Sequence, residues 1–97
     1  MDENTMRVSR VTEVKKLAGA IIKKHELGEK IILSCIGAAA LNQAVKAIGR
    51  SNSYFVVKGK ELSFVPSFEI VTINNEEGEN LERTAIILTG RVNDRWK

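Results

Sequence analysis

The spacing of hydrophobic and polar residues divides the chain into a short series of strands and helices. Residues 6–11 (MRVSRV) alternate apolar and polar side chains, which is the pattern of a half-buried β-strand. A helix is expected next, with Thr12 as its N-cap and Gly28 at its end. The apolar positions of this helix repeat at three- and four-residue intervals, and they are Val14, Leu17, Ala18, Ile21 and Ile22.

The following segment predicts a buried strand and a second helix. Residues 30–36 (KIILSCI) form a nearly continuous apolar run, which is typical of a central strand covered on both faces. Gly37 interrupts this run, and a second helix is predicted from Ala38 or Ala39 to about Ile48. The residues of this helix that are expected to face the core are Leu41, Ala44, Val45 and Ile48.

The remaining sequence favours β-structure. Residues 53–73 are rich in β-branched and aromatic side chains, with a bulge or break expected at Pro66, which lacks the N–H that a central strand needs. Residues 74–81 (NNEEGENL) have the composition of a hairpin loop, residues 83–92 form the last strand, and 93–97 form a polar tail. This order predicts an α+β fold, a two-layer sandwich with β-α-β-α-β-β order and two helices on a four-stranded sheet.

Length and composition indicate one domain of ordinary globular character. The 97 residues are too few for two independent cores, so a single domain over 1–97 is expected, with an ordered core at about 6–92. No apolar stretch approaches the roughly 20 residues that span a bilayer. The N-terminus lacks the basic start and apolar segment of an export signal. We therefore expect a soluble cytoplasmic protein with no membrane partner.

Residues suited to catalysis or metal binding are scarce. Cys35 is the only cysteine and lies in an apolar run, which predicts a buried small hydrophobic side chain in a reducing compartment. His25 is the only histidine and is expected on the surface near a helix end. One cysteine and one histidine are too few for a metal site, so we predict no metal, no cofactor and no enzymatic activity.

Charge is distributed unevenly along the chain. Residues 1–60 carry 11 basic and 5 acidic side chains, and residues 61–97 carry 4 basic and 7 acidic ones, so the first part is a candidate surface for a polyanion. Gly37, between a strand and a helix N-terminus, favours an anion there or simply makes a tight turn. Two amides and two cations share one face of the second helix, either as a ligand-binding face or as a solvated one: Asn42, Gln43, Lys46 and Arg50.

Several motifs resemble the stage V sporulation protein S family. GAAALNQAVKAI (37–48) is similar to the signature helix of that family, and MRVSRVTEVKKLAGAI (6–21) to its first strand and helix. FVPSF (64–68) is similar to its Ile-Pro-Ala-Phe stretch, and ERTAI (82–86) to a later strand. The resemblance covers most of residues 6–92. The family is itself similar to the Alba superfamily of small dimeric nucleic-acid-binding proteins with a β-α-β-α-β-β fold.

The resemblance implies a homodimer that binds DNA or RNA in sporulation or developmental gene regulation. The polar surface of Alba-like proteins includes the loop before the first helix, the glycine turn into the second helix and the hairpin arms. Transferred to this sequence by motif, and combined with the helix face above, it predicts eight nucleic-acid-binding residues: Arg10, Lys15, Lys16, Gly37, Asn42, Gln43, Lys46 and Arg50.

Two departures from the family pattern modify this expectation. Ala39 stands where the family usually has a second glycine, and the hairpin loop is longer than usual and acidic. Carboxylates repel a phosphate backbone, so we expect the helix face to dominate nucleic-acid binding. The alternative is a regulatory module that binds a protein partner through the sheet edge or the acidic loop, which carries Glu76, Glu77, Glu79 and Glu82.

Overall fold

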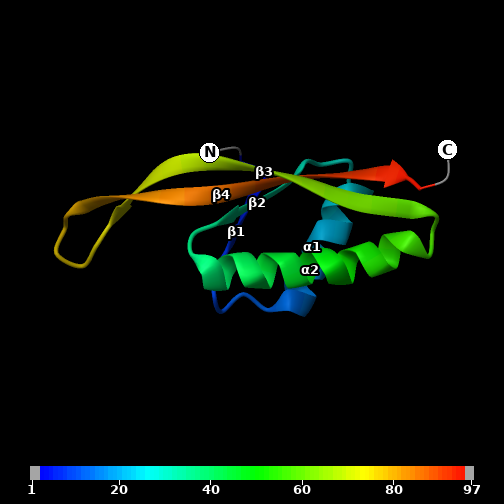
Figure 1. The fold of residues 1–97 in the computed structure, drawn as a ribbon, viewed down its shortest axis with the longest axis horizontal. Helices are drawn as coiled ribbons and strands as arrows, with labels where there is room; N and C mark the ends of the chain where they lie inside the picture. Colours follow the sequence, from blue (N-terminus) through cyan, green and yellow to red (C-terminus); the bar gives the residue numbers. More distant parts are fainter. Residues whose placement is uncertain (1–2, 96–97) are drawn as a thin grey trace.

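The computed structural model describes residues 3–95 and has the predicted β-α-β-α-β-β order. The four strands form one mixed sheet in the order β1-β2-β4-β3, in which β1 and β2 are parallel and the other pairs antiparallel. Both helices lie on one side of this sheet, which confirms the α+β two-layer sandwich (Figure 1). The elements are β1 (Thr5–Val8), α1 (Val14–Glu26), β2 (Ile31–Cys35), α2 (Ala38–Val56), β3 (Lys60–Asn74) and β4 (Asn80–Asp94).

Strand β2 occupies the centre of the sheet, as predicted. Its alternate residues Ile31, Leu33 and Cys35 face the helices and are at most 4% exposed. Ile32, which points to the opposite face, is only half-buried. The helices therefore cover one face of this strand and not both.

Helix α2 is longer than the sequence pattern predicts. The expected end lies near Ile48, with β-structure soon after, whereas the helix continues to Val56. Phe55 accounts for the difference, because it is 1% exposed and its ring meets those of His25 and Tyr54 edge-on, at centroid distances of 5.2 and 5.3 Å. Burial of this ring outweighs the weak helix propensity of the local sequence. His25 is thus half-buried against α2 and not the surface residue expected.

The side of α2 that faces the core is only partly the predicted one, because Ala44 is buried as predicted while the other predicted residues are not. Val45 is 55% exposed, and the larger apolar residues Leu41 and Ile48 lie only at the margin of the core. The hydroxyl of Ser51 lies 2.7 Å from the Ala47 carbonyl oxygen and 3.3 Å from that of Ala18 in α1, which shows how closely the two helices approach. The buried row of α2 consists mainly of small residues: Ala40, Ala44, Ala47 and Ser51, followed by Phe55.

Strands β3 and β4 form a long hairpin whose outer half projects beyond the helices (Figure 1). They pair without interruption along their whole length, so Pro66 neither breaks nor bulges β3. An edge strand tolerates a proline, and β3 is at the edge of the sheet. The hairpin connection predicted at 74–81 is confirmed, with the turn itself at 75–79.

The last strand extends into the predicted polar tail. Asp94 pairs with Lys60 across the hairpin, and the Lys60 Nζ lies 2.9 Å from the Asp94 Oδ1. The remainder of that tail, Trp96 and Lys97, lies outside the described residues.

One glycine of β4 permits a close contact in the core. A Cβ atom at Gly90 would lie 2.7 Å from the Phe64 ring, which packs across β4 at this point. A Cβ atom at Gly19, in the middle of α1, would have no such neighbour within 4 Å. No close contact therefore explains the glycine at this position.

Candidate nucleic-acid interface

The turn from β2 into α2 brings the positive end of a long helix to the surface. Gly37 has φ +90° and ψ 158°, a conformation that other residues rarely adopt, and it is the N-cap without a side-chain capping bond. The first helical hydrogen bond runs from the Leu41 amide to the Gly37 carbonyl oxygen over 3.1 Å. The preceding exposed amides of Ala38 and Ala39 therefore have no acceptor within the helix, and this end favours an anion.

The loop between β1 and α1 is a compact turn closed by two polar side chains. The amide of Ser9 donates to Thr12 Oγ1 over 2.8 Å, and the amide of Thr12 donates to the Ser9 carbonyl oxygen over 3.1 Å. Strand β1 consequently ends at Val8, whereas the sequence predicts strand up to Val11. Thr12 closes the turn instead of capping α1, whose N-cap is Glu13.

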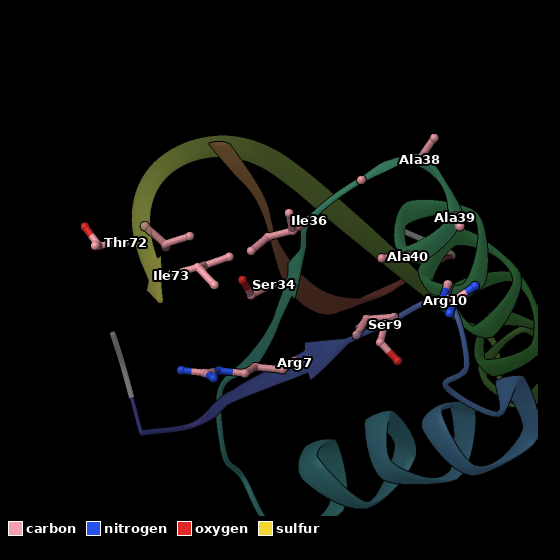
Figure 2. Close-up of a pocket in the computed structure, with 13 residues that line it drawn as sticks. Arg7, Ser9, Arg10, Ser34, Ile36, Ala38, Ala39, Ala40, Thr72 and Ile73 are labelled. Atoms are coloured by element: carbon pink, nitrogen blue, oxygen red, sulfur yellow. The ribbon is translucent and has the colours of Figure 1, made fainter. Parts of the chain in front are cut away.

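Gln43 fastens this turn to α2. Its Nε2 donates to the Thr12 carbonyl oxygen over 2.9 Å, and the side chain is half-buried. The sequence predicts Gln43 as a nucleic-acid contact, but in the structure its amide is occupied in holding the turn. This bond also affects the position of Arg10, because the turn that Gln43 holds places Arg10 near the start of α2. Arg10 and Gly37 line the same cavity there (Figure 2).

The other α2 residues that the sequence predicts as nucleic-acid contacts point away from the core. Asn42, Lys46 and Arg50 are exposed and follow one another at four-residue intervals, so they form a row along the helix. The stretch of α2 from its N-cap Gly37 to Arg50, which carries this row, is about 20 Å long. The 19 residues of α2 include no acidic side chain, so the row has no opposite charge on its own helix.

The two lysines of α1 are exposed in its first turn. Helix α1 packs beside α2, and within residues 3–95 neither Lys15 nor Lys16 shares a hydrogen bond or ion pair with α2. The Nζ of Lys16 lies 3.5 Å from Glu13 Oε2, with both side chains more than half exposed, so this ion pair is weak.

Arg7 is a cation that the sequence patterns do not single out. It lies in β1 opposite Ser34 of β2 and lines the same cavity as Arg10 and Gly37 (Figure 2). The alternation of side chains along a strand is the feature of the sequence that could have predicted its orientation. Because Val8 faces the core, its neighbour Arg7 faces away from the helices.

The hairpin tip is an ordered acidic turn at the outer end of the arm (Figure 1). Asn75 Oδ1 accepts hydrogen bonds from the amides of Glu77 and Glu79, over 3.0 and 2.9 Å. The glutamate side chains of the tip are exposed, and the tip lies beyond the helices. It is therefore separate from the cationic row of α2.

The described chain offers little for catalysis or metal binding. Between residues 3 and 95 there is no group of three or more side chains suited to hold a metal ion. Cys35 is 1% exposed, as predicted for a buried small hydrophobic residue, and burial raises the pKa of its thiol. Over the same residues, no helix is long and apolar enough to cross a membrane.

Comparisons with known proteins place this architecture in a family. The family described as stage V sporulation protein S matches residues 4–92, which is nearly the whole chain. The chain belongs to the stage V sporulation protein S family. Among solved structures it is similar to Alba from Thermoplasma volcanium, with a TM-score of 0.59 and 17% sequence identity over 88% of this chain and 98% of that one. This likeness confirms the predicted Alba-like fold.

In this member of the stage V sporulation protein S family, the Gln43 tether is testable by substitution. Gln43→Ala removes the hydrogen bond to Thr12 and is expected to lower the free energy of unfolding in urea by about 1 kcal/mol. Hydrogen exchange of the amides in the 9–12 turn should accelerate as well. The exposed neighbour serves as a control, since Asn42→Ala should stay within about 0.5 kcal/mol of wild type. Unchanged exchange in Gln43→Ala would show that the turn does not depend on this bond.

Proposed function

We propose that this protein is a regulatory protein that binds DNA or RNA through α2 and the adjacent turn. The observation that carries the proposal is a 19-residue helix without acidic side chains that exposes Asn42, Lys46 and Arg50 in one row. The row begins in the first turns of α2, whose N-terminus has no side-chain cap. The name of the family supports a role in sporulation, and its resemblance to the Alba superfamily supports nucleic acid as the ligand.

Phosphate contacts dominate the proposed binding mode. Lysine and arginine neutralise phosphates, while Asn42 is available for sugar hydroxyls or base edges. Aromatic residues make up only 5% of the chain, so stacking on bases is not the main contact. Gln43 acts indirectly by holding the turn that carries Arg10. The proposed contact set is Arg10, Lys15, Lys16, Gly37, Asn42, Lys46 and Arg50.

The acidic hairpin supports a second candidate function, binding of a basic protein partner. Its tip carries exposed carboxylates on a turn ordered by Asn75, and the arm holds the tip clear of the helices. Glu76, Glu77 and Glu79 would contact such a partner. This surface would act independently of the cationic row, because the two lie on different parts of the molecule.

We also infer that the protein is a homodimer in the cytoplasm. Leu62 and Phe64 of β3 pack in or against the core, and alternation places Phe68 and Ile70 on the same face of the strand, beyond the helices. Phe68 is 78% exposed and Ile70 69% exposed, which is unfavourable for large apolar side chains that have no partner. A second copy of the chain would cover them. The free, buried Cys35 is consistent with a reducing cytoplasm.

Charge reversal on α2 tests the nucleic-acid interface. Lys46→Glu/Arg50→Glu should abolish the binding of fluorescently labelled RNA or duplex DNA, measured by anisotropy over a salt series. For the wild type, neutralisation of four to six phosphates predicts that log K falls against log salt with a slope on the order of −3 to −5. The milder Lys46→Gln/Arg50→Gln should flatten this slope by about 2.

A matched double variant controls for the change in net charge. Lys23→Glu/Arg91→Glu alters two exposed cations outside the proposed contact set, and it should retain most of the wild-type affinity. Equal losses of affinity in the two charge-reversal variants would show that binding depends only on the net charge of the protein. If no variant, including the wild type, binds either probe at low salt, the acidic hairpin becomes the favoured functional surface.

The dimer is tested through the exposed apolar face of β3. Light scattering after size exclusion should give twice the chain mass of 10.8 kDa for the wild type and the chain mass for Phe68→Asp. Val65→Asp provides the control, because Val65 is 66% exposed on the opposite face of the same strand and the variant should remain dimeric. A monomeric wild type, or a dimer that survives Phe68→Asp, would contradict this interface.

A further inference from the structure

A cavity of about 680 Å³ lies where β1 and β2 end, where α2 begins and where the outer part of β3 curls over them (Figure 2). Its walls come from residues 7–10, from 34 and 36–40, and from 71–73, three segments far apart in the sequence. This volume is in the range of pockets that hold small organic ligands. The carboxyl ends of neighbouring parallel strands are also a common position for such sites.

Ser34 places a hydroxyl group at the cavity. The residue is 6% exposed and lines the cavity, and its hydroxyl has no hydrogen-bond partner among residues 3–95. Figure 2 shows this hydroxyl pointing into the space bounded by Arg7, Ile36 and Ile73. No fully buried side-chain nitrogen or oxygen of the described residues lacks a partner, so the Ser34 hydroxyl is open to the cavity and available to a group that enters it.

Charge gives the main indication of a ligand. Arg7 and Arg10 both line the cavity, and neither forms an ion pair with another described residue. The walls also carry the Gly37 turn and the amides that begin α2. No acidic side chain lies among the described residues that form the walls. Arg10 lies beside the helix N-terminus and Arg7 on the other side of the cavity (Figure 2), and the positive charge at the Arg10 end favours an anion, above all a phosphate.

The rest of the wall restricts the body of the ligand. Ile36, Val71 and Ile73 form an apolar surface, and besides Ser34 only Ser9 and Thr72 contribute hydroxyls. A sugar phosphate would leave most of its hydroxyl groups without partners against such a wall. A nucleotide fits better, because its phosphate can meet the cations, its ribose the few hydroxyls and its flat base the apolar side chains.

We propose that this cavity binds a nucleoside 5′-monophosphate, either free or as the 5′-terminal residue of a nucleic-acid strand. The phosphate lies against the α2 N-terminus with Arg10, and the base packs on Ile36, Val71 and Ile73 on the side of the cavity where Arg7 lies (Figure 2). The site goes beyond the polyanion interface described above, with which it shares Arg10 and the Gly37 turn. Arg7 and Ser34 belong to this site alone.

Isothermal titration of the whole chain with inorganic phosphate and with each of the four ribonucleoside 5′-monophosphates tests the proposal. At least one nucleotide should bind saturably and at least tenfold more tightly than phosphate, since the cavity also holds the nucleoside. Arg7→Ala should weaken that binding by about tenfold or more, and Ser34→Ala by about two- to tenfold. Arg91→Ala, which removes an exposed arginine from β4 outside the cavity, should leave it unchanged.

Two results would overturn the proposal. One is the absence of saturable binding of all four nucleotides at millimolar concentration. The other is an equal effect of Arg7→Ala and Arg91→Ala, which would mean that only overall charge matters. Both arginines are exposed and both variants are expected to fold, which circular dichroism would verify.

Labelled RNA of one sequence, with either a 5′-phosphate or a 5′-hydroxyl, distinguishes the two sources of the nucleotide. The comparison is made in the Lys46→Glu/Arg50→Glu background, which removes the α2 row. A preference for the phosphorylated strand that Arg7→Ala abolishes assigns the site to strand ends, and equal binding of both strands assigns it to free nucleotides. Nucleotide titration of the same background separates the proposals, because the cavity should retain its ligand even where the α2 interface has failed.

Discussion

The packing of α2 through small residues determines which of its side chains face solvent. Ala40, Ala44 and Ala47 are at most 2% exposed, and together with Ser51 they let the helix lie close to α1 and the sheet. Only side chains of this size fit such a contact, so the rotation of the helix about its axis is fixed. The cationic row and Val45 are turned outward as a consequence.

A second constraint determines where that helix begins. Gly37 alone among the residues of this segment can adopt the conformation that turns β2 directly into α2, and it leaves the first amides of the helix without a cap. Gln43, one turn into the helix, then holds the β1–α1 turn in place. Arg10 and the first amides of α2, which come from two separate segments, thereby lie together near the carboxyl ends of β1 and β2.

Local patterns predict much of the fold and less of the site. The order of the elements, the central position of β2, the turn at Gly37 and the hairpin at 74–81 all follow from residue type and spacing. The end of α2 does not, because burial of Phe55 overrides the β-propensity of its neighbours. The side of α2 that faces the core is predicted incorrectly at Val45 for a related reason. Hydrophobic periodicity favours burial of the more hydrophobic valine over alanine, whereas the close packing of this helix requires alanine.

The site depends on contacts that no local pattern contains. The bond from Gln43 to Thr12 joins residues 31 positions apart, so the amide is indistinguishable in the sequence from one that is free to bind a ligand. Nothing in the local sequence of β1 or β2 marks Arg7 and Ser34, which become neighbours at one cavity only when the two strands pair and β3 curls over them. Asn42, Lys46 and Arg50, by contrast, share a face through helix geometry alone, and the structure confirms their exposure.

The central claim is that nucleic acid contacts α2 and the turn beside it and not the acidic arm. Two-dimensional ¹H–¹⁵N NMR during titration with a short single-stranded RNA at low salt measures this residue by residue. The largest shifts are expected at the amides of residues 9–16 and 37–50, with residues 75–79 nearly unchanged. Shifts concentrated at 75–79, or no shifts at all, would contradict it.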